Sequence, residues 1–182
     1  MNYVEPIRDP EKVKLISSYL KETSIRNYMM FMIGIYSGLR ISDILNLRVC
    51  DVKNKSNINI REKKTKKQKI FEINPILKKE IKKYCEGKSM NEYLIKSREC
   101  KNKPISRSMA YRIMKEAGDL FRINDLGTHT LRKTFGYHHY KQYKDVVMLQ
   151  NIFNHASPTI TLKYIGYEQE NINKSIKNFK IF

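Results

Sequence analysis

The residues in this sequence best suited to chemistry are two arginines, two histidines and a tyrosine. Arg40 ends a Gly-Leu-Arg run, and the last third of the chain carries His129, Arg132, His155 and Tyr164. Guanidinium groups neutralise phosphate oxygens, imidazoles move protons near neutral pH, and a phenol supplies an oxygen nucleophile. Together these groups could hold a phosphodiester and attack it without a metal ion, which points to covalent chemistry on DNA.

The charge of the chain also favours a polyanionic partner. Lys and Arg number 36 against 18 Asp and Glu, which leaves a net charge of +18 at pH 7. Such an excess favours nucleic acid, because each neutralised phosphate releases condensed counterions. The alternative is a lysine-rich surface that reflects codon bias alone. Together with the reactive residues described above, the charge leads us to predict double-stranded DNA as the partner.

The cysteines and the apolar segments restrict where the protein can act. Cys50, Cys85 and Cys100 include no C-x-x-C pair, which argues against a disulfide framework and a thiolate zinc site. The N-terminus lacks the basic and apolar regions of a signal peptide, and the longest apolar run, residues 28–36, is too short for a bilayer. We expect a cytoplasmic protein with no bound metal and no membrane contact.

The elements that must position the reactive residues are mainly helical. Apolar periodicity predicts helices over residues 10–22, 24–37, 41–47, 75–85, 106–118, 129–143 and 146–153, a short segment after Pro158, and a tail from 168 onward. Gly38 should end the second helix, so Arg40 would lie at a joint between two helices. Such a joint is a rigid place from which to aim a side chain.

One region has the period of β-structure instead. Ile58 and Ile60 alternate with asparagines, and residues 70–73 form a second β-like run. The lysine-crowded turn between them predicts a hairpin whose tip can reach into a groove. Residues 87–104 look like a loop with a short strand at 93–95. We therefore predict a single mainly α domain of the α+β class, residues 1–182, with helices around a small antiparallel hairpin.

The ordered set of motifs resembles the tyrosine recombinases, the phage integrase family. The resemblance rests on Gly38-Leu39-Arg40-Ile41-Ser42-Asp43, the hairpin at Lys64, His129-x-x-Arg132, and His155 with Tyr164 nine positions later. It extends in the family's order from the second helix to Tyr164. It implies the family's catalytic-domain fold and a reaction that needs no cofactor.

The resemblance assigns a role to each motif residue. Arg40 and Arg132 would clamp the scissile phosphate, and Tyr164 would attack it to give a 3′-phosphotyrosyl link and a free 5′-hydroxyl. His129 and His155 would assist proton transfer and contact the phosphate. Tyr167 remains the alternative nucleophile, with core packing as its other explanation.

Lys64 would protonate the departing 5′-oxygen, although its lysine neighbours leave the register open. Asp43, one helical turn after Arg40, would orient the guanidinium, and an ordinary helix N-terminal carboxylate explains it equally well. The residues expected to contact DNA without catalysing are Lys63, Lys66, Lys67 and Lys133.

The chain departs from the family pattern in two places. Phe153-Asn154-His155 stands where relatives usually have Leu-Gly-His, which should change a turn and no catalytic group. The N-terminal helical domain of the family's recombinases is not expected here, so the chain is either a naturally short recombinase or a fragment of a longer integrase.

The tail, residues 168–182, carries Ile172, Ile176 and Phe179 on one stripe. In the family such a helix docks onto a neighbouring protomer, whereas packing within the same chain is the alternative. We predict a monomer in solution that assembles as a tetramer on paired DNA sites.

The predicted function is that of a site-specific recombinase catalytic domain. The alternatives are a type IB topoisomerase-like activity, and a DNA-binding module or regulator that has little activity alone.

Overall fold

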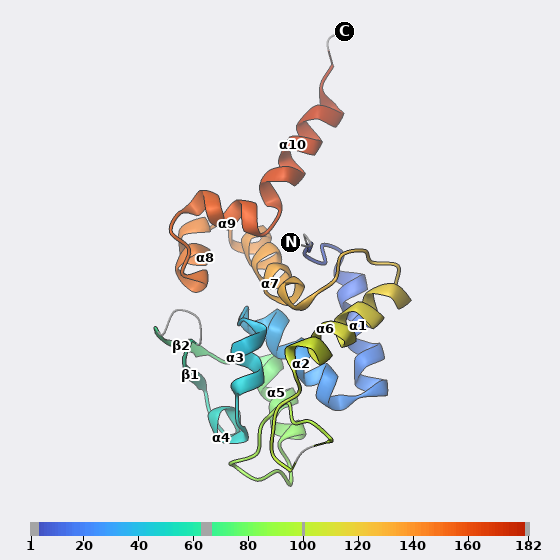
Figure 1. Cartoon of the computed structure of the whole chain (residues 1–182). Helices are drawn as coiled ribbons and strands as arrows, with labels where there is room; N and C mark the ends of the chain where they lie inside the picture. Colours follow the sequence, from blue (N-terminus) through green and yellow to red (C-terminus); the bar gives the residue numbers. More distant parts are fainter. Residues whose placement is uncertain (1–3, 63–66, 100, 181–182) are drawn as a thin grey trace.

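The computed structural model describes residues 4–62, 67–99 and 101–180, which form a body of helices with one small sheet at its side (Figure 1). The helices are α1 (Pro10–Thr23), α2 (Ile25–Ser37), α3 (Ile41–Asn46), α4 (Val49–Val52), α5 (Pro75–Tyr84), α6 (Arg107–Leu120), α7 (Thr128–Tyr143), α8 (Val146–Phe153), α9 (Pro158–Tyr164) and α10 (Tyr167–Asn178). The strands are β1 (Asn57–Arg61) and β2 (Gln68–Glu72). The predicted class, mainly α with a small antiparallel hairpin, is confirmed.

Helix α2 forms the centre of the main core and packs against α1, α5 and α7. Its residues 28–34 are all buried, as expected for a helix that is apolar on nearly every side. It ends at Gly38, whose φ of 61° is left-handed and whose missing Cβ leaves room for the ring of Phe135. This turn sets Arg40, the N-cap residue of α3, at a fixed joint.

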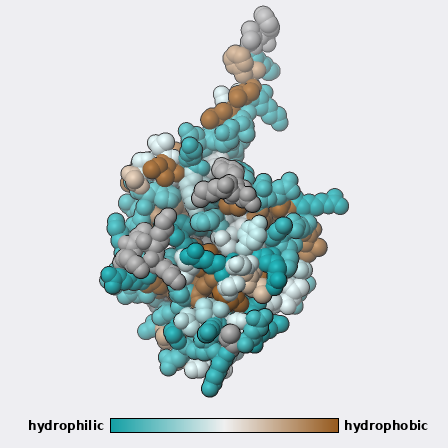
Figure 2. Space-filling model, in the orientation of Figure 1, coloured by the Kyte–Doolittle hydropathy of each residue, from teal (hydrophilic) through white to brown (hydrophobic). Residues whose placement is uncertain are grey.

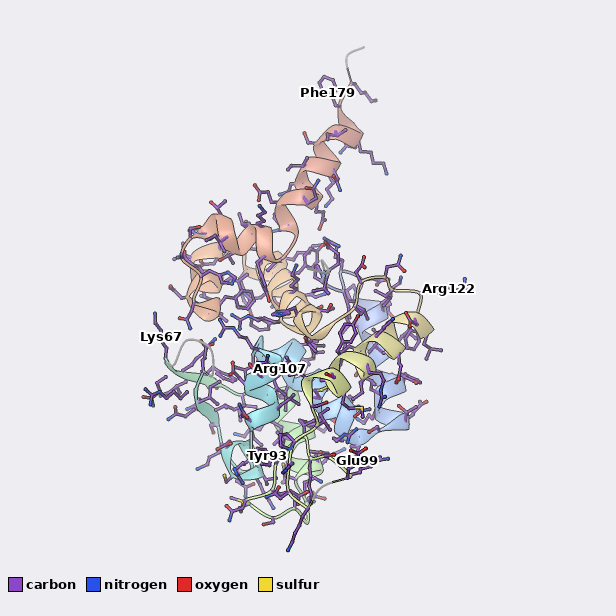
Figure 3. All side chains as sticks on the ribbon, in the orientation of Figure 1. Lys67, Tyr93, Glu99, Arg107, Arg122 and Phe179 are labelled. Atoms are coloured by element: carbon purple, nitrogen blue, oxygen red, sulfur yellow. The ribbon has the colours of Figure 1, made fainter. Side chains whose placement is uncertain are left out.

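The hairpin forms where the alternating isoleucines predicted it. β1 and β2 pair antiparallel from Asn57–Glu72 to Arg61–Gln68, and Ile58 is buried beneath them. Residues 63–66 of the turn lie outside the described residues. Lys67, the first described residue after them, is labelled in Figure 3.

The strand predicted at residues 93–95 was wrong. Tyr93 makes only an isolated bridge with Arg48, and the Leu94 amide donates to the Leu47 carbonyl at 2.8 Å. The segment therefore packs against the loop between α3 and α4 through one bridge and one backbone hydrogen bond. It pairs with no strand among the described residues.

A second, smaller core joins α7, α8 and α9. Tyr137, Leu149, Phe153 and Ile165 are its buried members. Gly136 allows α7 to pack closely against Phe153 and Ile165, because a Cβ at this position would lie 2.7 Å from both side chains. This core fixes the end of α9, which carries Tyr164.

Helix α10 projects from the body of the protein (Figure 1), and none of its residues is buried. The predicted apolar stripe is exposed, with Ile176 at 70% and Phe179 at 72%. Brown side chains mark it in the otherwise largely hydrophilic view of Figure 2, and Phe179 lies near its far end in Figure 3. The base of α10 is held by Glu170, which accepts from the Tyr137 hydroxyl at 2.7 Å. In the described part of the chain, no helix has the length and apolarity to cross a bilayer.

Replacing Gly136 with alanine should lower the free energy of unfolding by about 1–3 kcal/mol. The added methyl overlaps Phe153 and Ile165, which outweighs the better helix propensity of alanine. Urea denaturation measures this, with Gln142→Ala on the exposed surface of the same helix as the control. Equal or greater stability of the Gly136 variant would show that α7 does not pack this closely.

Candidate active site

Arg132 is the buried anchor of the site. It lies on α7 with 2% of its surface exposed, and its Nη1 donates to the Gly38 carbonyl at 2.6 Å. Its Nη2 donates to the Phe153 carbonyl at 2.8 Å, and the guanidinium carbon lies 4.2 Å from the centre of the Phe153 ring. Arg132 therefore joins the end of α2 to the end of α8.

Arg40 reaches the same region from the start of α3. Its Nη1 lies 2.8 Å from Oε1 of Glu62, a carboxylate with no exposed surface at the end of β1. The Arg40 side chain is 17% exposed, so part of it faces solvent. Because Gly38 accepts from Arg132 and lies two residues before Arg40, the two arginines belong to one cluster.

Tyr164 and His155 meet over Phe153. The rings of His155 and Tyr164 are 5.0 Å apart at 72°, and the Tyr164 ring is 5.6 Å from that of Phe153. The ammonium of Lys133 lies 5.3 Å from the centre of the Tyr164 ring. The residue predicted as the nucleophile thus lies beside a histidine and among cations.

His155 is neutral in this setting. Burial, and then the charges of Arg132 and Arg40, lower its pKa to about 4. Its Nδ1 lies 3.1 Å from the Thr161 hydroxyl, which itself donates to the Ser157 carbonyl. Since that hydroxyl proton is already used, Nδ1 carries the imidazole proton and Nε2 is the basic nitrogen.

Tyr164 is protonated at neutral pH. Burial raises its pKa, and the charges of Arg132 and Arg40 together with a hydrogen bond from Arg132 offset part of that rise. Burial also lowers the pKa of Arg132 to about 10, an effect that Tyr164 opposes and Arg40 increases. These mutual effects place Arg40, Arg132, His155 and Tyr164 within one electrostatic cluster.

The remaining predicted residues occupy different environments. His129 is exposed one helical turn before Arg132, and Asp43 is buried on the first turn of α3. The Asp43 charge raises the pKa of Arg132, so Asp43 acts on the Arg132 guanidinium, and its orientation of Arg40 stays a prediction. Lys133 is only 6% exposed, so it lies beneath the surface where we expected a DNA contact.

The hairpin lysines are only partly described. Lys63, Lys64 and Lys66 lie outside the described residues, and Lys67 is exposed where β2 begins. Sequence reasoning missed Lys69, whose Nζ donates to the Ile152 carbonyl at the end of α8. Burial, followed by the charge of Arg132, lowers the pKa of Lys69 to about 8.

Glu62 was missed as well, although the sequence carried a signal for it. It is the only acidic residue in the lysine-rich run 61–69. A single negative charge among so many positive ones indicates a specific cationic partner.

The alternative nucleophile, Tyr167, lies in a different environment. Its hydroxyl accepts from Lys144 at 3.3 Å and its ring packs edge-on against Tyr140 at 4.6 Å. His138 contacts the Ile7 carbonyl, and His139 packs between Phe135 and Tyr143. These contacts give the two histidines packing roles.

Comparison with known proteins supports the same conclusion as the geometry. The model of the phage integrase family matches residues 8–171. A probable integrase/recombinase, YoeC of Bacillus subtilis, is 48% identical over 179 residues, which cover 98% of both chains. The crystal structure of XerH recombinase bound to a palindromic difH substrate in a post-cleavage complex superposes with a TM-score of 0.74 at 17% identity over 97% of this chain. A λ integrase tetramer bound to a Holliday junction superposes with a TM-score of 0.68 at 16% identity over 90%.

The chain therefore belongs to the phage integrase family, the tyrosine recombinases, and its fold is that of their catalytic domain. The predicted family and enzyme class are confirmed. The chain spans nearly the whole of the Bacillus subtilis relative, but only 54% of the XerH chain and 49% of the λ integrase chain.

We expect His155 to stay neutral at pH 6, because burial beside two arginines disfavours its cation. An NMR titration of the ring nitrogens should give a midpoint near pH 4 and a proton on Nδ1 above it. The unfolded chain binds this proton near pH 6.5, so the histidine makes folding less favourable as the pH falls from about 6.5 towards 4. A midpoint at or above about 6.5 would contradict the burial of this ring.

Proposed function

We propose that this chain is the catalytic domain of a site-specific DNA recombinase that cleaves and rejoins strands through a phosphotyrosyl intermediate. The observation that carries the proposal is the meeting of two arginines, a neutral histidine and a tyrosine from four separate segments. Family membership and the XerH structure bound to its DNA substrate support it.

The first step is the capture of the scissile phosphate. Arg40 and Arg132 present planar forks that match non-bridging oxygens, and their charge stabilises the negative charge that develops at phosphorus. The exposed part of the Arg40 side chain gives phosphate a way in, while Arg132 is held in place by two carbonyls. His129, exposed one turn before Arg132, adds a further phosphate contact.

In the chemical step the Tyr164 oxygen attacks phosphorus and displaces the 5′-oxygen. The phenol proton passes to Nε2 of His155, which the Thr161 contact leaves as the basic nitrogen. Lys64 of the hairpin protonates the departing 5′-oxygen, as the family resemblance implies. The products are a 3′-phosphotyrosine and a 5′-hydroxyl, and attack by another strand's 5′-hydroxyl reverses the step without consuming a cofactor.

Assembly on DNA would use the projecting tail. An apolar stripe exposed at Ile172, Ile176 and Phe179 suits docking on a neighbouring protomer. The λ integrase tetramer on a Holliday junction is the model for that arrangement. We propose a monomer that forms a tetramer on paired double-stranded DNA sites, with the exposed Lys67 among the phosphate contacts, in the cytoplasm where its DNA substrate lies.

A suicide DNA substrate, nicked beside the cleavage site, tests the reaction. Wild-type protein should form a covalent protein–DNA adduct, and Tyr164→Phe should form none, because it lacks the attacking oxygen. Tyr167→Phe is the matched control and should react normally. Salt-sensitive DNA binding without any adduct would favour the binding-module alternative, and relaxation of supercoiled DNA without strand exchange would favour the topoisomerase.

Arg132→Lys should slow adduct formation by about 100-fold or more, since a point charge cannot replace the two-pronged contact. The same substitution at the exposed Arg107 of α6, labelled in Figure 3, is the control and should have little effect. Single-turnover kinetics measures both variants. Near-normal cleavage by Arg132→Lys would remove Arg132 from the clamp.

A further inference from the structure

Glu62 links one catalytic segment to another through its two carboxylate oxygens. Oε1 lies 2.8 Å from Nη1 of Arg40, and Oε2 accepts from the Asn154 side-chain amide at 3.2 Å. The carboxylate is fully buried, so both contacts form away from bulk water. Through Glu62, the start of α3 is tied to the turn that leads into His155.

Asn154 is suited to this link by its backbone as well as its amide. It caps α8 with a left-handed φ of 54°, which asparagine tolerates better than most residues. The preceding carbonyl, Phe153, accepts from Arg132, and the following residue is His155. A glycine here would satisfy the turn but could not donate to Glu62, so asparagine adds a contact that the backbone does not require.

The charges around Glu62 explain why a carboxylate can be buried here. Its charge raises the pKa of both Arg132 and Lys69, so it acts on cations beyond its partner Arg40. A buried charge is costly unless it is paired and hydrogen-bonded, and Glu62 meets both conditions. Glu62 contacts Arg40 through Nη1, and a guanidinium has five N–H donors, so a phosphate can bind the same side chain.

We propose that Glu62 is a positioning residue of the active site, which holds the Arg40 fork in a fixed relation to the His155 turn through Asn154. Its effect on cleavage rests on the proposed function, whereas its effect on Arg40 does not. Two variants separate the contacts. Glu62→Gln removes the charge with little change in shape, and Asn154→Gly removes the amide while keeping the left-handed turn. Glu72→Gln, the same change at an exposed position of β2, is the matched control.

The first measurement is NMR of the arginine side-chain Nε–H groups in the DNA-free protein, with the Arg40 signal assigned through its loss in Arg40→Lys. Glu62→Gln and Asn154→Gly should both speed hydrogen exchange at the Arg40 Nε–H, and Glu72→Gln should not. An unchanged Arg40 signal in Glu62→Gln would overturn the proposal.

The second measurement compares the rate of adduct formation with DNA affinity and thermal stability. Glu62→Gln should slow the adduct by about tenfold or more, while DNA affinity stays equal or increases because a negative charge near the phosphate is lost. Asn154→Gly should slow it less. Parallel losses of rate, affinity and melting temperature in Glu62→Gln would indicate a structural role and overturn the proposal. Failure of the wild-type protein to form any adduct would refute the proposed function instead, and the NMR result would still decide the role of Glu62.

Discussion

The site depends on one buried guanidinium held by two backbone carbonyls. Arg132 donates to Gly38 at the end of α2 and to Phe153 at the end of α8. Helix ends leave carbonyls without partners, and a buried cation that donates to both joins the two helix ends. The main core and the smaller core therefore meet at Arg132, and Arg40 and His155, each two residues after one of those carbonyls, are brought together.

Burial sets the protonation states on which the chemistry relies. Burial and the charges of Arg132 and Arg40 together lower the pKa of His155 and keep it neutral, whereas burial raises the pKa of Tyr164 and keeps it in its phenol form against those same charges. The resting site thus holds the proposed nucleophile, Tyr164, with its proton, beside the neutral imidazole proposed to accept it. Glu62 and Asp43 balance part of the positive charge, so the cluster can exist before DNA arrives.

Sequence patterns predicted the elements but not all of their contacts. The all-round apolar character of α2 and the alternation of Ile58 and Ile60 identified a central helix and a hairpin, and both formed. Helix α4 was missed because four residues are too few to show a helical period. The prediction of a strand at 93–95 was wrong because a strand needs a partner strand, and local residue propensity does not show whether one is available.

For the site, as for the fold, the sequence predicted the residues better than their contacts. Motif spacing identified five candidate residues, namely Arg40, His129, Arg132, His155 and Tyr164. The fold brings four of them into one cluster, and His129 is exposed one helical turn from Arg132. Burial was less predictable. Residues 130–134 of α7 are all buried, so Lys133 lies inside although its charge suggested the surface. The contacts of Glu62 and Lys69 join segments about 90 residues apart, and no local pattern encodes such a pairing.

In the proposed mechanism both guanidinium forks and the Tyr164 oxygen act on one phosphorus. A crystal structure of the protein on nicked DNA with orthovanadate, which mimics five-coordinate phosphorus, tests it most directly. Vanadium should be bonded to the Tyr164 oxygen, with its equatorial oxygens contacted by Arg40 and Arg132. Vanadate held elsewhere, or the two arginines on different phosphates, would contradict it.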